Sequence, residues 1–477
     1  MSVDRVLAWL DEHDQDSINH LIDWLKIPSI GTDPAYDEHT RRAAEWCRDH
    51  LRGSGFDVDL IETAPPGGRG QPMVFGHSKA DPAYKGPRVL FYGHYDVQPP
   101  DPLELWSNPP FEPVIKPAEG KVGERIVARG AEDDKGQVTM FLEAMRGWHE
   151  VSGKPAGGVP FTIMIEGEEE SGSVNLERFV ETHKDVLSKN DVVLISDTAM
   201  LGRGKPAITY GVRGLVYTEI TLHAADQDLH SGAWGGKCPN PLNELAKVLA
   251  KLWDADRRVT IPGFYDDVKP LADEERELWK KLGIDEVEAL AGIGLGPDAN
   301  LGEKGYSFTE REWARPTCDI NGMWGGYTGE GAKTVIPSHA KAKVSFRLVG
   351  DQVPQKIFDA FKAWLNANTP AGCRWGDVID HGLGQPATLP VDSEELRAAA
   401  RALKRASGTD AALIKSGGSI PVAGLLKQDL GLDTIFMGFG LEDDRIHSPN
   451  EKYELSSFRL GARSHAVLID ELWKLGG

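Results

Sequence analysis

The segment from Glu166 to Ser171 gathers acidic side chains directly after an apolar run, Phe161–Ile165, that has the composition of a strand. Adjacent carboxylates repel one another, so such a cluster is stable chiefly where a cation or a shared proton compensates the charge. One acid could then bind a metal ion while its neighbour moves a proton, as in a metal-dependent hydrolase. A solvated acidic turn is the alternative, and it is the commoner explanation for an isolated run.

A histidine and an aspartate stand two residues apart in the strand-like run Val89–Val97. The side chains of His94 and Asp96 therefore share one face of an extended segment. In that position a carboxylate can hold an imidazole in the tautomer that a metal requires. A structural His–acid pair explains the spacing equally well.

Three more segments carry possible ligands. The acids at 132–134 precede a helical run, Asp197 ends a strand-like run, and His447 lies in a polar loop. A helix cap, a solvated strand-end acid and a surface histidine are the ordinary explanations of each. Three consecutive acids nevertheless exceed what a helix cap needs.

Together these segments offer two histidines, three carboxylates and one spare glutamate. Oxygen and imidazole ligands without thiolate suit Zn²⁺, and also Mn²⁺ or Co²⁺. Two divalent ions and three carboxylates leave one positive charge, which a bridging hydroxide would neutralise. Such a metal-bound hydroxide is a nucleophile near neutral pH. The cysteines stand far apart with no CxxC pair, so neither a disulfide framework nor a thiolate zinc site is indicated. They are Cys47, Cys238, Cys318 and Cys373.

The elements that must position these groups alternate between strands and helices. Strand-like runs occupy 73–75, 89–97, 161–165 and 192–195, and helical runs occupy 137–151 and 175–187. This alternation predicts an α/β fold with a mixed, mostly parallel sheet covered by helices, and functional groups at the carboxyl ends of the strands.

The middle of the chain has a different pattern, with strand-like runs at 215–222 and 342–349 and helical runs at 241–253 and 353–365. We expect a smaller α/β unit here, inserted into a discontinuous larger domain. The predicted limits are 1–208 and 387–477 for the larger, catalytic domain and 209–386 for the insertion.

Composition narrows the function classes. The chain has 477 residues, with 53 Lys and Arg against 73 Asp and Glu, for a net charge of −20. A nucleic-acid partner is disfavoured because phosphate backbones are bound by cations. The N-terminus lacks a basic region followed by an apolar core, and no apolar run reaches membrane-spanning length. A cytoplasmic enzyme without a membrane partner is expected.

The motifs of the chain resemble those of the co-catalytic zinc peptidase family that includes carnosine dipeptidase, acetylornithine deacetylase, succinyl-diaminopimelate desuccinylase and aminoacylase. The likeness spans nearly the whole chain and is nearest to the carnosine dipeptidase branch. It rests on GHYDVQP (93–99), RGAEDDKG (129–136), EGEEESGS (166–173), SDT (196–198), DLHSGAWGG (228–236), KTVIP (333–337), SFRLV (345–349), GGSIPV (417–422) and IHSPNEK (446–452).

The resemblance implies two metal ions per subunit, bridged by Asp133. One ion would also be held by His94 and Asp197, and the other by Glu170 and His447. It also implies that Asp133 and Asp134 are joined by a cis peptide bond.

The remaining catalytic roles follow from the same resemblance. Glu169 would be the general base and acid, and Asp96 would orient His94. His230 would reach the developing oxyanion from the partner subunit of a homodimer, so that the insertion would act as a lid and dimerisation domain. A helix cap or a packing histidine is the alternative for His230.

Substrate contacts are implied as well. Arg347 lies on an otherwise apolar strand, where an unpaired guanidinium would be costly, and its fork suits the C-terminal carboxylate of a substrate. Thr334, Ser419 and the turn at Gly418 would add donors, although ordinary turn bonding explains the hydroxyls nearly as well.

Within the resembling family, dipeptidases tend to carry Asp at the position of Asp197, whereas deacylases tend to carry Glu. The sequence therefore predicts a metallodipeptidase for dipeptides with a free amino terminus. An N-acyl amino acid deacylase on the same scaffold and a catalytically silent dimeric binding protein are the alternatives.

Overall fold

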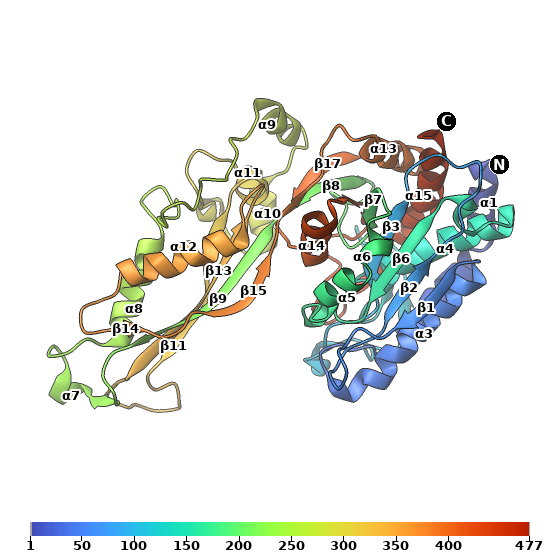
Figure 1. Cartoon of the computed structure of the whole chain (residues 1–477). Coiled ribbons are helices and arrows are strands. Elements are labelled where there is room, and N and C mark those ends of the chain that lie inside the picture. Colours follow the sequence, from blue (N-terminus) through green and yellow to red (C-terminus); the bar gives the residue numbers. More distant parts are fainter. Residues whose placement is uncertain (1, 477) are drawn as a thin grey trace. The chain divides into compact units, whose positions relative to one another are not determined.

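The computed structural model describes residues 2–476, which divide into two compact units (Figure 1). Unit 1 contains the chain up to Tyr210, Leu389–Ile414 and the segment from Leu426 onward. Unit 2 contains Gly211–Thr388 and Lys415–Leu425. Unit 2 thus includes a short segment that lies outside the predicted insertion, 209–386. Whether the predicted segments fold as independent domains stays a prediction.

The short segment Lys415–Leu425 belongs to unit 2 because its turn at 417–419 is hydrogen-bonded to other residues of that unit. Arg213 Nε donates to the carbonyl of Gly417 at 2.9 Å, and Arg347 Nη1 donates to Ser419 Oγ at 2.8 Å. Both partners of each bond lie in unit 2.

Within the described residues, a nine-stranded mixed sheet has most of its residues in unit 1. Its spatial order is β1 (Asp57–Ile61), β2 (Met73–His77), β6 (Phe161–Glu166), β3 (Val89–His94), β7 (Val192–Ile195), β18 (Asp433–Phe436), β8 (Ala207–Val212) and β16 (Ala387–Thr388), with β17 (Ala412–Ser416) also paired to β8. Strand β16 and the ends of β8 and β17 belong to unit 2. The central strands β6, β3, β7 and β18 pair in parallel. Strands β3, β6 and β7 are buried along their whole length, as their apolar sequences require.

Helices cover this sheet (Figure 1). They are α1 (Val3–Glu12), α2 (Asp14–Leu25), α3 (Asp37–Gly53), α4 (Lys135–Ser152), α5 (Leu176–Thr182), α6 (Lys184–Leu187), α13 (Glu394–Ser407), α14 (Pro421–Leu430) and α15 (Leu455–Lys474). The predicted α/β class is confirmed, with parallel pairing confined to the central strands. No helix of residues 2–476 is long and apolar enough to cross a membrane.

Strand β3 ends at His94, short of the predicted end at Val97. The chain turns away there, because the Val97 amide donates to the Ser29 carbonyl at 2.9 Å and Val97 forms an isolated parallel bridge with Ile30. Asp96 consequently lies beyond the strand, in the turn that follows it.

A small antiparallel sheet also belongs to unit 1, in the order β19 (Lys452–Glu454), β5 (Arg125–Val127) and β4 (Val114–Lys116). In chain order β4 and β5 precede the acids at 132–134, and β19 follows the His447 loop. Its strands come from two distant parts of the sequence.

In the described part of unit 2, an antiparallel sheet has the order β11 (Thr317–Gly325), β13 (His339–Leu348), β9 (Gly214–His223) and β14 (Arg374–Trp375), with β15 (Ile379–Gly384) also on β9. Helices α8 (Pro241–Leu249) and α12 (Pro354–Ala367) lie on this sheet (Figure 1), and their apolar side chains share its core. Strands β9 and β13 alternate buried and half-buried residues, as strands with one covered face do. The short strands β10 (Leu229–His230) and β12 (Val335–Ile336) pair separately, and α7 (Ser231–Trp234), α9 (Asp273–Lys280), α10 (Glu286–Gly292) and α11 (Phe308–Trp313) complete the unit.

Candidate metal centre

The carboxyl ends of the central strands are aligned. His94 of β3 pairs with Glu166 of β6, and Ile195 of β7 lies opposite both Tyr92 of β3 and Phe436 of β18. The loops that follow these strands therefore emerge at one edge of the sheet, where ligands of α/β proteins usually bind.

Two groups of possible ligands share Asp133 at this edge. His94, Asp133 and Asp197 form one group, and Asp133, Glu170 and His447 form the other. Asp133 Oδ1 lies 3.0 Å from His94 Nε2, and Asp133 Oδ2 lies 2.9 Å from His447 Nε2. His447 Nε2 is also 3.3 Å from Glu170 Oε2. Asp133 thus offers one oxygen to each group, as a carboxylate bridging two ions must.

The cluster holds more negative charge than a buried site tolerates without cations. Burial and the charge of Asp133 raise the pKa of Asp197 to about 7 and raise that of Glu170 as well. Hydrogen bonds to Asp133 and Glu170 raise the pKa of His447 to about 10. Protons on these side chains therefore balance the negative charge that bound cations would otherwise balance. The mixed oxygen and imidazole donors fit two divalent cations.

Glu169 stands beside the ligands without belonging to either group. Burial, with the charges of Glu170 and Asp133 adding to it, raises the pKa of Glu169 to about 7. A carboxyl group with a pKa near neutrality can both take and return a proton.

Asp96 contacts both the histidine and the acidic turn. His94 Nδ1 lies 3.1 Å from the Asp96 carbonyl oxygen and 3.4 Å from Oδ1. The Asp96 carboxylate accepts hydrogen bonds from the main-chain N–H groups of Glu169 at 3.3 Å and Glu170 at 3.1 Å. The sequence analysis missed this contact of Asp96 with the amides of Glu169 and Glu170. The one signal for it was that both segments directly follow strands expected to be parallel neighbours.

Another supporting residue, Glu451, was missed although it lies within a motif of the resemblance. Its buried carboxylate accepts bonds from Arg129 Nη1 at 2.8 Å and from the amides of Gly130, Glu132 and Asp133 at 2.9, 3.0 and 3.1 Å. It therefore fixes the loop that carries the shared ligand. The Asp133–Asp134 peptide bond in this loop is cis.

The predicted substrate residues of unit 2 fall into two separate places. Arg347 contacts Ser419, in the segment that also holds Gly418. His230 pairs with Val335 in β10 and β12, and the Ser231 amide donates to the Thr334 carbonyl at 3.1 Å. The exposed His230 accepts a hydrogen bond at Nδ1 from the Gly232 amide.

These two places lie at opposite ends of β13. His339 begins the strand just after β12, and Arg347 lies eight positions further along it. At about 3.3 Å per residue, that is roughly 26 Å. Within one chain, therefore, Thr334 does not join Arg347 and Ser419 as the sequence suggested, but lies next to His230.

A third ligand-like group within the described residues contains His20, His50 and Glu143. The buried Glu143 also accepts hydrogen bonds from Ser17 Oγ and Arg146 Nε, each at 2.8 Å. Because the guanidinium already neutralises this carboxylate, the group is an ion-pair network that fastens α2, α3 and α4 together.

Residues 90–471 match Peptidase family M20/M25/M40. The chain belongs to this peptidase family. It is 31% identical to the human Beta-Ala-His dipeptidase over 99% of this chain and 93% of that protein, and 32% identical to the Cys-Gly metallodipeptidase of Candida albicans over 92% and 91%. The crystal structure of human carnosine dipeptidase 1 superposes with a TM-score of 0.81 at 28% identity, covering 99% of both chains. The predicted family and the predicted class, a hydrolase of the metallopeptidases, are confirmed.

Proposed function

We propose that this M20/M25/M40 peptidase hydrolyses dipeptides that have a free amino terminus, using two divalent ions held by His94, Asp133, Asp197, Glu170 and His447. The observation that carries the proposal is that Asp133 belongs to both ligand groups, whereas Glu169, the neighbour of Glu170 in the chain, belongs to neither. The names of the two relatives, a Beta-Ala-His dipeptidase and a Cys-Gly metallodipeptidase, support the choice of dipeptides. Zn²⁺ fits the donors best, and Mn²⁺ or Co²⁺ also fit.

Two divalent ions bound by these residues would supply an acidified water and would polarise the scissile carbonyl. Glu169 would accept a proton from the attacking water and pass it to the leaving amine, which its raised pKa allows. Asp96 keeps Glu169 in place by accepting its main-chain N–H and keeps His94 oriented.

Arg347 is proposed to bind the C-terminal carboxylate of the substrate. Its guanidinium is half-buried and donates to Ser419 Oγ, a neutral partner. Burial lowers the pKa of Arg347, so an added anion would stabilise the charged form. Gly418 and Ser419 would complete this subsite.

We propose a homodimer in which His230 serves the neighbouring site. A dipeptide spans at most about 7 Å, far less than the distance between the two ends of β13. A substrate held by Arg347 therefore cannot reach His230 or Thr334 of the same chain. The edge strand β11 exposes Ile320, Met323 and Trp324, a surface suited to a second copy.

A cytoplasmic location is also proposed. The cysteines Cys47, Cys238, Cys318 and Cys373 are free thiols, which agrees with a reducing compartment.

The test compares matched substrates on metal-stripped protein reloaded with Zn²⁺, Mn²⁺ or Co²⁺. The substrates are β-Ala-His, Cys-Gly and their N-acetylated forms, with an N-acetyl amino acid added. Turnover of the free dipeptides alone supports the proposal. Turnover of acylated substrates alone would establish the deacylase instead, and no turnover with any loaded metal would leave the silent binding protein.

A further inference from the structure

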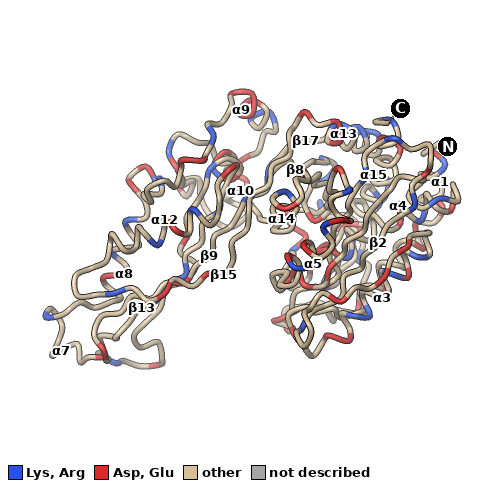
Figure 2. Tube along the Cα trace, in the orientation of Figure 1, with Lys and Arg blue, Asp and Glu red and all other residues tan. Residues whose placement is uncertain are grey.

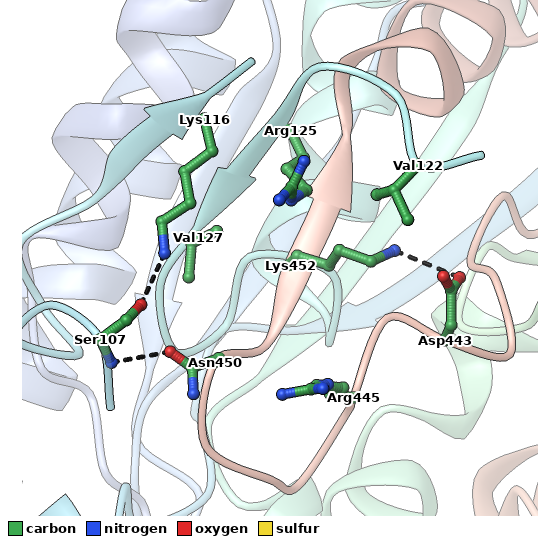
Figure 3. A pocket seen from close by; sticks show the side chains of 9 residues that line it. All are labelled: Ser107, Lys116, Val122, Arg125, Val127, Asp443, Arg445, Asn450 and Lys452. Carbon is green, nitrogen blue, oxygen red and sulfur yellow. Dashed lines mark hydrogen bonds and ion pairs between the residues drawn. The ribbon is translucent and has the colours of Figure 1, made fainter. Parts of the chain in front are cut away.

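Unit 1 contains a cavity of about 350 Å³ between the small sheet and the loop at 443–450. Among the described residues that line it, the charged side chains are four cations and one acid: Lys116, Arg125, Arg445, Lys452 and Asp443. Figure 3 shows Lys116, Arg125 and Lys452 on the strands and Arg445 across from them on the loop. This cavity is called the basic pocket below.

The strand register concentrates the positive charge on one face. Lys116 of β4 lies directly opposite Arg125 of β5, and Lys452 of β19 lies opposite Val127. Since side chains two apart share a face, all three cations project on the same side of the sheet. Like charges directly opposite one another in a sheet are destabilising, so this arrangement calls for an anion.

The carboxylates near the sheet are engaged elsewhere. Arg203 Nη2 donates to Asp443 Oδ2 at 2.7 Å and to Glu454 Oε1 at 2.5 Å. Lys452 is bonded to the buried Asp444 and lies 3.2 Å from Asp443. These three acids are bonded to Arg203 and Lys452, and no hydrogen bond or ion pair of the described residues joins them to Lys116, Arg125 or Arg445.

The remaining cations are poorly compensated. Lys116 Nζ donates to a neutral group, Ser107 Oγ, at 2.5 Å. Arg125 Nη1 donates to the Pro117 carbonyl, a neutral group, at 2.8 Å. Its one carboxylate contact, at 3.3 Å, is with Glu119, whose side chain is 84% exposed and therefore screened by water. In the described part of the chain the side chain of Arg445 has no hydrogen bond or ion pair, and it faces the pocket (Figure 3).

We propose that the basic pocket binds a small phosphate-class oxyanion. An arginine fork can bind two phosphate oxygens, which suits the side chain of Arg445, while Lys116 and Arg125 add positive charge from the strands across the cavity (Figure 3). The volume exceeds that of a free phosphate ion, so a small phosphate ester also fits. Acidic and basic residues are interspersed along unit 1 (Figure 2), and the chain carries a net charge of −20, so the attraction for an anion is local to this pocket.

Occupancy of the pocket would affect the loop that carries His447. Arg445 and His447 belong to one loop and both have left-handed backbone conformations, with φ of 59° and 58°. An anion held between Arg445 and the strands would restrain this loop. The pocket is independent of the dipeptidase proposal, because none of its residues belongs to either ligand group.

The test is calorimetric titration of the full chain with inorganic phosphate and, separately, glycerol 3-phosphate. The pocket variant is Lys116→Gln with Arg445→Gln. The matched control, Arg397→Gln with Lys404→Gln on α13, removes the same charge at a distant exposed helix. Wild type and control should bind one oxyanion per chain in metal-loaded and metal-stripped protein, and the pocket variant should bind at least about tenfold more weakly.

Two results would overturn the proposal: equal binding by the pocket variant, or binding that disappears when the metal is removed, which would place the anion on the ions. Hydrogen exchange supplies a second measurement. Amides of 441–450 should exchange more slowly with phosphate present in wild type and control, and unchanged exchange in wild type would refute the effect on the loop. Failure of dipeptide hydrolysis has no bearing on either measurement.

Discussion

The carboxylate of Asp96 accepts a hydrogen bond from the main-chain N–H of Glu169 at 3.3 Å. Asp96, just beyond β3, thus fixes the turn that follows the neighbouring strand β6. This turn contains Glu169, the proposed proton carrier. The same carboxylate lies 3.4 Å from His94 Nδ1. One side chain therefore connects the orientation of His94, a proposed metal ligand, with the position of Glu169, the proposed general base.

Replacing Asp96 should consequently affect both properties. In Asp96→Ala we expect metal affinity to fall by about 10- to 100-fold, the usual effect of losing a group that orients a histidine ligand. Activity should stay reduced even at saturating metal, because the Glu169 turn is no longer held. Metal titration and kcat at saturating Zn²⁺ measure the two effects. Asp16→Ala, on the exposed side of α2, is the control, and full activity of Asp96→Ala at saturating metal would contradict the second role.

Glu169→Gln separates proton transfer from metal binding. The substitution keeps the size of the side chain but cannot accept the proton, so kcat should fall by about 10²- to 10⁴-fold. Metal content, measured by mass spectrometry, should remain two ions per chain. Normal turnover would exclude Glu169 as the base, and loss of an ion would mean that it is a ligand.

Glu451→Gln should destabilise the protein strongly. It leaves the buried Arg129 without its anion and weakens four hydrogen bonds. Removing one partner of a buried ion pair costs about 3–5 kcal/mol, which urea unfolding of the metal-stripped protein would detect. Glu442→Gln, exposed in the same loop, should have little effect; similar losses in both variants would argue against a special role of Glu451.

Mixed dimers test whether His230 acts across subunits. His230→Ala and Glu169→Gln chains should each be inactive as homodimers. In a mixed dimer, one site combines an intact Glu169 with an intact His230 from the partner, so activity should partly return. Verified mixed dimers that remain inactive would show that His230 serves its own chain.

His465 should make stability depend on pH. Burial lowers the pKa of His465 to about 3, whereas in the unfolded chain it is near 6.5. Between these values the unfolded state binds the extra proton, so stability is lost as the pH falls below about 6.5, by up to about 1.4 kcal/mol per pH unit. In urea unfolding of metal-stripped protein from pH 7 to 5, His465→Gln should show a shallower slope. His77→Gln, at an exposed position, should keep the wild-type slope, and an identical slope in His465→Gln would refute the assignment.

Local sequence predicted the central strands well, because apolar runs ending in acids or histidines leave few alternatives. It could not predict where β3 ends, since Val97 turns away to pair with a segment near residue 30. It also could not reveal the contact of Asp96 with the Glu169 turn or the bonds of Glu451, which join residues far apart in the chain. Nor could it show that Thr334 and Arg347 of one chain lie toward opposite ends of β13, because motifs carry no distances.

The length of β13 would make the activity of the enzyme depend on its dilution. Arg347 and the segment next to His230 lie toward opposite ends of a ten-residue strand. If both act on one substrate as proposed, a single copy would have two incomplete sites and no complete one. Specific activity would then fall as the copies dissociate, while each still carries its full load of ions. The concentration of the protein in the cell, as well as that of its substrate, would then determine its specific activity.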